Sequence, residues 1–109
     1  MRIRPDSWKP RKLDPNDPAQ MDAFNEEYCN ACRILNIPRD QMLVTFEQAA
    51  EYLRISPRSV LRYVHAKPRI LDRELVPFQG KRTHAMVVLD SVVEYVVAKA
   101  FDRRRRATQ

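Results

Sequence analysis

The segment TFEQAAEYLRISPRSVLRYV, residues 45–64, decides the fold of this 109-residue chain. Thr45 is followed three residues later by Gln48, the spacing of a capping box, in which both side chains accept hydrogen bonds from backbone N–H groups at a helix start. Ser56 followed by Pro57 is a second N-cap, with proline at the first helical position, where its missing N–H costs nothing. The segment therefore predicts two short helices joined by a tight turn.

Helical spacing places the apolar residues of each helix on one face, with an isoleucine in the turn between them. These residues are Phe46, Ala49, Ala50 and Leu53, then Ile55, then Val60, Leu61 and Val64. The adjacent alanines allow the second helix to cross closely over the first, which is the packing of a helix-turn-helix. The face left outside on the second helix carries Arg58, Ser59, Arg62 and His65.

The pattern T-x-x-Q-A-A-E-Y-L-x-I-S-P-R-S-V-x-R-Y resembles the start of the excisionase-like and MerR-like winged helix-turn-helix domains of phages and mobile elements. The resemblance covers the chain from Leu43 to Phe101. This chain departs from the family in a longer link, residues 65–76, between the second helix and the wing. The resemblance implies an α+β fold, a mainly helical winged helix-turn-helix with a small β-hairpin wing. An N-terminal amphipathic helix and a C-terminal helix are added to it.

The resemblance also implies a sequence-specific double-stranded DNA-binding protein of the bacterial host cytoplasm, associated with the nucleoid. It would act as an excisionase-like recombination directionality factor or as a small transcriptional regulator. The helix from Pro57 would lie in the major groove, where Arg58 and Arg62 can each make a bidentate contact to guanine. The long dimerisation helix of MerR regulators is not expected, because the chain ends about one helix after the wing. This favours the excisionase side.

The length predicts one domain with a single core. No apolar run approaches the roughly 20 residues of a membrane span, no signal peptide is recognisable, and two cysteines indicate a reducing cytoplasm. Residues 14–53 carry two basic and eight acidic side chains, whereas residues 54–106 carry thirteen basic and five acidic ones. The excess of basic charge thus begins where the second helix of the helix-turn-helix begins, as a phosphate-facing surface requires.

Residues 1–16 contain three prolines and five basic residues without periodicity, which predicts an extended arm. Such an arm can follow a phosphate backbone, although an unattached terminus is the simpler interpretation. Asp17-Pro18 opens a helix over residues 17–36, whose other face is acidic and is not expected to touch DNA. Its apolar stripe comprises Met21, Phe24, Tyr28, Cys32 and Leu35.

Cys29 and Cys32 form a Cys-x-x-Cys pair inside this helix. Zinc requires four ligands, and the two histidines, His65 and His84, have no zinc-finger spacing relative to the cysteines. Redox use would place the pair at a helix start after a strand. Packing is therefore the favoured role, and no metal or other cofactor is expected.

After Val64 the sequence changes from helical to extended patterns over residues 70–89. The chain's only glycine, Gly80, marks a turn between two such segments. Strand, turn and strand predict a wing, with Lys81, Arg82, Thr83 and His84 at its tip as DNA contacts.

Asp90 is expected to cap a last helix, residues 90–102, with a broad valine-rich face. Part of this face can meet the first helix, and part can meet a second subunit. An Arg-rich tail, residues 103–109, follows. The domain of residues 17–102 would then contact the DNA backbone through Arg54, and the tail would contact it through Arg103, Arg104, Arg105 and Arg106.

No catalytic constellation is recognisable, so an enzyme is not expected. The alternative to DNA binding is a protein-binding adaptor, with a recombinase, a polymerase or a packaging component as partner. RNA binding is disfavoured because the few aromatic residues fall on apolar faces. The sequence leaves open whether the protein forms a homodimer or assembles cooperatively on DNA.

Overall fold

Three of the four helices begin where local capping signals predict. In the computed structural model, which describes residues 9–78 and 82–107, helix α1 spans Pro18–Leu35, α2 spans Phe46–Leu53, α3 spans Pro57–His65 and α4 spans Leu89–Ala107. Asp17 caps α1, the capping box of Thr45 and Gln48 is formed at α2, and Ser56 caps α3. These boundaries confirm the predicted helix at residues 17–36 and the predicted pair of helices within residues 45–65.

Three antiparallel strands complete an α+β fold, in agreement with the predicted class. Strand β1 spans Leu43–Val44, β2 spans Arg73–Phe78 and β3 spans Arg82–Val88, in the order β1-β3-β2. β2 and β3 pair from Arg73 opposite Val87 to Phe78 opposite Arg82. The predicted hairpin is therefore present, while the turn at Gly80 and Lys81 lies outside the described residues.

Two details of the extended segments differ from the prediction. β1 was not predicted as a strand, and it forms because Leu43 and Val44 pair with Val88 and Val87, which are distant in sequence. Ile70 and Leu71, predicted to be extended, belong instead to the connection after α3. Their backbone N–H groups donate to the Tyr63 carbonyl at 3.1 and 3.2 Å.

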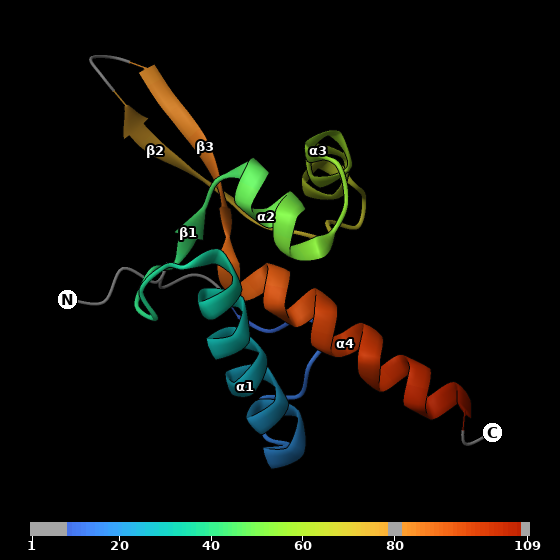
Figure 1. Cartoon of the computed structure of the whole chain (residues 1–109). Coiled ribbons are helices and arrows are strands. Elements are labelled where there is room, and N and C mark those ends of the chain that lie inside the picture. The colour runs from blue at the N-terminus through green and yellow to red at the C-terminus, as the bar shows by residue number, and fades with distance from the viewer. Residues whose placement is uncertain (1–8, 79–81, 108–109) are drawn as a thin grey trace.

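The core lies where α1, α2 and α4 meet the sheet (Figure 1). The α1 stripe is buried at Phe24, Tyr28 and Cys32, and α1 packs against α4, as predicted for part of the valine-rich face. The valines of α4 that are buried are Val92, Val93 and Val97. Burial of this face stabilises a helix whose many β-branched residues give it a poor intrinsic helical propensity.

Helix α4 differs from the prediction at both ends. It begins at Leu89, directly after β3, so Asp90 is a buried residue of the first turn and not the cap. Ser91 occupies the junction instead: its Oγ donates to the Val88 carbonyl at 2.7 Å and accepts from the Asp72 N–H at 3.0 Å. At the other end α4 continues to Ala107, so Arg103–Arg106 lie on a helix and not in a separate tail.

Residues 9–14 of the predicted arm are attached to the body of the protein. Leu13 is buried in the core, and the backbone N–H groups of Arg11, Lys12 and Leu13 donate to Glu94 Oε2 on α4 at 2.8, 3.2 and 3.4 Å. Arg11 also forms an ion pair with Asp72 at 3.3 Å. The expectation of an unattached extended segment is therefore wrong for this part. Trp8 and the residues before it lie outside the described residues.

Within the described part of the chain, none of the helices has both the length and the apolar character that crossing a membrane requires.

Candidate nucleic-acid interface

Helix α3 is held against α2 by its apolar face. Val60 and Val64 are buried on α3, and Ala49 and Ala50 are buried on α2, so two small side chains face the crossing helix. The turn between the helices is closed by Arg54, which has a left-handed backbone with φ of 58° and serves as the C-cap of α2. This packing fixes which face of α3 points outward.

The outward face of α3 is basic, as the sequence predicts. Arg58, Arg62 and His65 are exposed, and Ser59 is half-buried between them and the body. Arg62 Nη2 donates to Ser59 Oγ at 3.0 Å, and Ser59 Oγ lies 3.1 Å from Ser56 Oγ. The hydroxyl of Ser59 therefore holds the guanidinium of Arg62 one helical turn away, along the surface of α3.

One prediction for an α3 side chain needs correction. Leu61 was placed on the apolar face with Val60 and Val64, but 46 % of it is exposed, because it lies at the flank of the narrow stripe that α2 covers. Tyr63 packs on Tyr95 of α4, with the ring centroids 5.6 Å apart, and a hydrogen bond with Tyr95 raises the pKa of Tyr63.

The predicted wing residues lie on a separate projection of the fold. In Figure 1 the ends of β2 and β3 away from α4 extend beyond the body, and they and α3 lie on the side opposite α1. His84 is exposed on β3 opposite Val76, and Arg82 and Thr83 precede it on the same strand. Lys81 lies outside the described residues. Helix α3 and the far ends of β2 and β3 thus lie on one side of the molecule.

The residues predicted to contact the DNA backbone lie on α4 and in the turn after α2. Arg54 and Arg103 line one shallow pocket together with Tyr95 and Lys99. Arg104 is exposed, with its guanidinium carbon 5.5 Å from the centre of the Phe101 ring. Arg105 and Arg106 occupy the following positions of α4.

Lys12 and Lys99 were not predicted from the sequence as functional residues. Their ammonium groups lie 5.4 and 5.2 Å from the centre of the Tyr95 ring, beside the residues just described. No local signal could have found Lys12, because it reaches α4 through the docking of residues 9–14. The only sequence signal for Lys99 was that it is a basic residue within a valine-rich helix.

The cysteines are free thiols with different surroundings. Cys29 is exposed and Cys32 is buried, and burial raises the pKa of the Cys32 thiol. Across residues 9–78 and 82–107, no three His, Cys, Asp or Glu side chains come together in an arrangement that could hold a metal ion.

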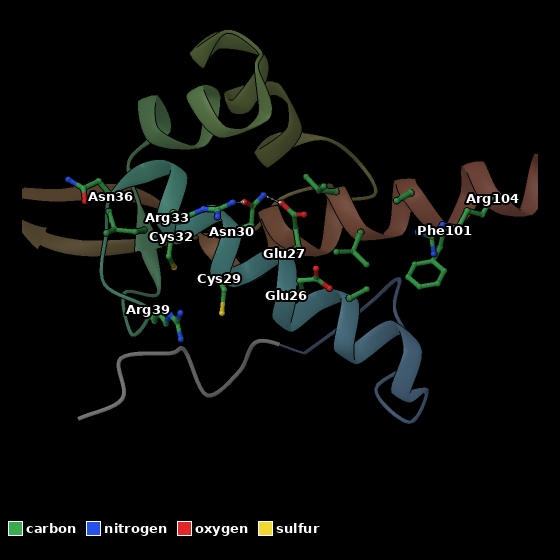
Figure 2. Close-up of a pocket in the computed structure, with 15 residues that line it drawn as sticks. Glu26, Glu27, Cys29, Asn30, Cys32, Arg33, Asn36, Arg39, Phe101 and Arg104 are labelled. Carbon is green, nitrogen blue, oxygen red and sulfur yellow. Dashed lines mark hydrogen bonds between the residues drawn. The ribbon is translucent and has the colours of Figure 1, made fainter.

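A groove lies between α1 and α4. Its volume is about 860 Å³, and its apolar lining includes Val96, Val97, Ala100 and Phe101 of α4. Figure 2 shows the polar side chains at its rim, with Glu26 and Cys29 on α1 and Arg104 on α4.

A scan against protein-family models, a search of the curated proteins and a search of the solved structures each find no match for this chain.

Proposed function

We propose that this protein is a winged helix-turn-helix protein that binds double-stranded DNA in a sequence-specific manner. The observation that carries the proposal is the outward face of α3, where Arg58, Arg62 and His65 are exposed on a helix fixed from behind by Val60 and Val64. A helix presented in this way fits the major groove, whose width of about 12 Å admits one helix.

Base recognition would come from Arg58 and Arg62. Either guanidinium can donate two parallel hydrogen bonds to O6 and N7 of guanine, a contact worth about 1–3 kcal/mol of discrimination against another base. The hydrogen bond from Arg62 to Ser59 reduces the number of orientations that the guanidinium must lose on binding. His65 lies near the C-terminal end of the same face and would contact a base or a phosphate.

Sequence-independent affinity would come from the surrounding cations. Arg54 and the arginines of α4, Arg103–Arg106, would contact backbone phosphates on one side of α3. On another side of α3, the wing would reach the DNA backbone or the minor groove. Its contacting residues would be Lys81, Arg82, Thr83 and His84. Asp22 and Glu26 of α1 are exposed, whereas Glu27 of α1 lines the same shallow pocket as Arg54 and Arg103.

The biological role that fits this reading is that of an excisionase-like recombination directionality factor or a small transcriptional regulator of a phage or mobile element. It is supported by the resemblance of residues 45–64 to such domains.

The direct test is binding to duplex DNA from the protein's own genetic neighbourhood and to scrambled duplex, over a range of salt concentrations. Preferential binding to the native duplex that persists as salt rises, and its loss in the Arg58→Ala/Arg62→Ala double variant, are expected. Equal and steeply salt-dependent binding to both duplexes would reduce the protein to a general DNA-coating factor. Absence of binding at moderate salt would contradict the proposal.

A protein-binding adaptor is the second candidate function, and the groove between α1 and α4 favours it. Its apolar lining fits an amphipathic helix of a partner protein, and exposed Glu26 at the rim would face a basic side chain of that helix. The adaptor hypothesis predicts that Ala100→Arg abolishes binding to a protein encoded beside it, while Arg58→Ala/Arg62→Ala leaves that binding unchanged. The DNA-binding hypothesis predicts the reverse pattern for DNA.

A further inference from the structure

Tyr95 of α4 has two lysine side chains beside its ring. The ammonium of Lys12 lies 5.4 Å and that of Lys99 5.2 Å from the ring centre, within the range of a cation–π contact. Lys12 comes from the docked N-terminal segment and Lys99 from α4 itself, one turn after Tyr95. Both lysines are exposed. The fold therefore gathers two like charges at one aromatic surface.

These charges have no carboxylate partner in the part of the chain that the structure describes. The ion pairs found there join Arg11 and Arg69 to Asp72. The nearest buried carboxylate in sequence, Glu94, is occupied by the backbone N–H groups of residues 11–13. The positive charge at Tyr95 is thus available to an anion from outside the chain.

The surface is continuous with α3. Tyr95 packs against Tyr63 with a centroid separation of 5.6 Å, and the charges of Arg62 and Lys99 both act on the Tyr63 hydroxyl. Tyr95 also shares a shallow pocket with Lys99, Arg54 and Arg103. The same pocket holds Glu27, whose carboxylate accepts a hydrogen bond from the Tyr52 hydroxyl. A path of cationic and hydroxyl groups therefore runs from the outward face of α3 onto α4.

We infer that Lys12, Lys99 and the hydroxyls of Tyr63 and Tyr95 form a binding site for the phosphodiester backbone of duplex DNA that flanks the α3 site. The inference rests on the proposed function, because it extends the same DNA path. A helix in the major groove has a phosphate strand along each of its sides. On the α4 side of α3, Tyr63 packs on Tyr95, and Lys12 and Lys99 lie beside the Tyr95 ring, so a strand on that side would pass these four groups. The docked segment of residues 9–14 thereby contributes a phosphate contact that α4 alone lacks.

The site is one-sided, which gives it a specific signature. Tyr63 marks the flank of α3 that faces α4, whereas Leu61 marks the opposite flank. Lys12 and Lys99 are therefore expected to contact the duplex that flanks the recognised bases on one side. Removal of the duplex on the other side is expected to leave their contacts unchanged.

The test uses a duplex enriched by the full-length protein from a randomised library, with long flanks on both sides. The Lys12→Gln/Lys99→Gln variant is compared with Arg33→Gln/Arg39→Gln, which removes the same charge from exposed residues around the α1–α4 groove. The slope of log Kd against log salt is expected to fall by about 1.8 in the lysine variant, since each lost phosphate contact contributes about 0.9. The control variant is expected to retain nearly the wild-type slope, and Lys12→Arg/Lys99→Arg is expected to restore it.

Trimming one flank of the duplex is expected to remove the difference between wild type and the lysine variant, while trimming the other leaves it. Equal slopes for the lysine variant and the wild type, or equal losses in the lysine and control variants, would overturn the inference and leave the DNA-binding proposal standing. If the library yields no preferred sequence, the proposed function fails and this inference fails with it.

Discussion

The carboxylate of Glu94 accepts a 2.8 Å hydrogen bond from the backbone N–H of Arg11, a residue 83 positions earlier in the chain. The same oxygen accepts from the next two backbone N–H groups. Successive backbone N–H groups of this kind form a concave site for an anion. Here the anion is a side chain of the protein itself, so Glu94 fixes the N-terminal segment on α4 and positions Lys12 beside Tyr95.

Glu94→Gln is expected to lower the free energy of unfolding by about 2 kcal/mol, because hydrogen bonds to a charged acceptor contribute about 1.5–3 kcal/mol and the amide replaces that charge. Urea denaturation measures the change. Glu26→Gln, on the exposed face of α1, is the matched control, for which a change below about 0.5 kcal/mol is expected. Equal effects of the two substitutions would show that the docked segment does not depend on Glu94.

Arg54 combines a structural and an electrostatic role, and substitutions can separate them. Its left-handed backbone, with φ of 58°, is unfavourable for a residue with a Cβ atom. Arg54→Gly is expected to exceed Arg54→Ala in free energy of unfolding by about 1 kcal/mol. Both variants are expected to lose the same amount of salt dependence in DNA binding, a slope of about 0.9 for one phosphate contact. A difference between them in DNA binding would mean that the turn geometry, and not the charge, is what matters there.

Tyr52 gives the protein a predictable response to alkaline pH. Burial, together with a hydrogen bond to the Glu27 carboxylate, raises the pKa of Tyr52 well above its ordinary value of 10. The unfolded chain can ionise this phenol above pH 10 while the folded protein keeps it protonated, so stability falls as pH rises beyond that value. In Tyr52→Phe the decline above pH 10 is expected to be less steep. Urea midpoints measured from pH 8 to 11 provide the comparison, and parallel curves would contradict it.

The two cysteines are expected to differ in reactivity. Cys29 is exposed, whereas Cys32 is buried and burial raises the pKa of its thiol, which lowers the thiolate fraction. A thiol-reactive disulfide reagent is expected to modify one thiol rapidly and the second only as the protein unfolds. Cys29→Ser should remove the rapid phase and Cys32→Ser the slow one. Two rapid phases in the native protein would contradict the packing of α1.

The sequence predicted the features that depend on neighbouring residues. The starts of α1, α2 and α3 follow from caps within three residues of each helix, and the apolar stripe of α1 follows from its own spacing. The exposed face of α3 was predictable because Val60 and Val64 can point in only one direction when α2 is packed against them.

The features that were missed depend on contacts between distant parts of the chain. β1 has two residues and exists only through its pairing with Val87 and Val88. The docking of residues 9–14 depends on Glu94, which sequence spacing alone cannot connect with them. Asp90 looked like a cap because aspartate favours that position. In the fold β3 leads directly into α4, which places Asp90 inside the first turn.

The most direct test of the central claim, that the outward face of α3 contacts DNA, is site-specific photo-crosslinking from two matched positions. Leu61 on α3 is 46 % exposed, and Asn25 on α1 is exposed and lies outside the pocket lined by Arg54 and Arg103, so a photoreactive amino acid at either position replaces an exposed side chain. Crosslinking from position 61 to the bases of the preferred duplex, with none from position 25, is the predicted result. Crosslinking from position 25, or none from position 61 while the duplex is bound, would contradict the account.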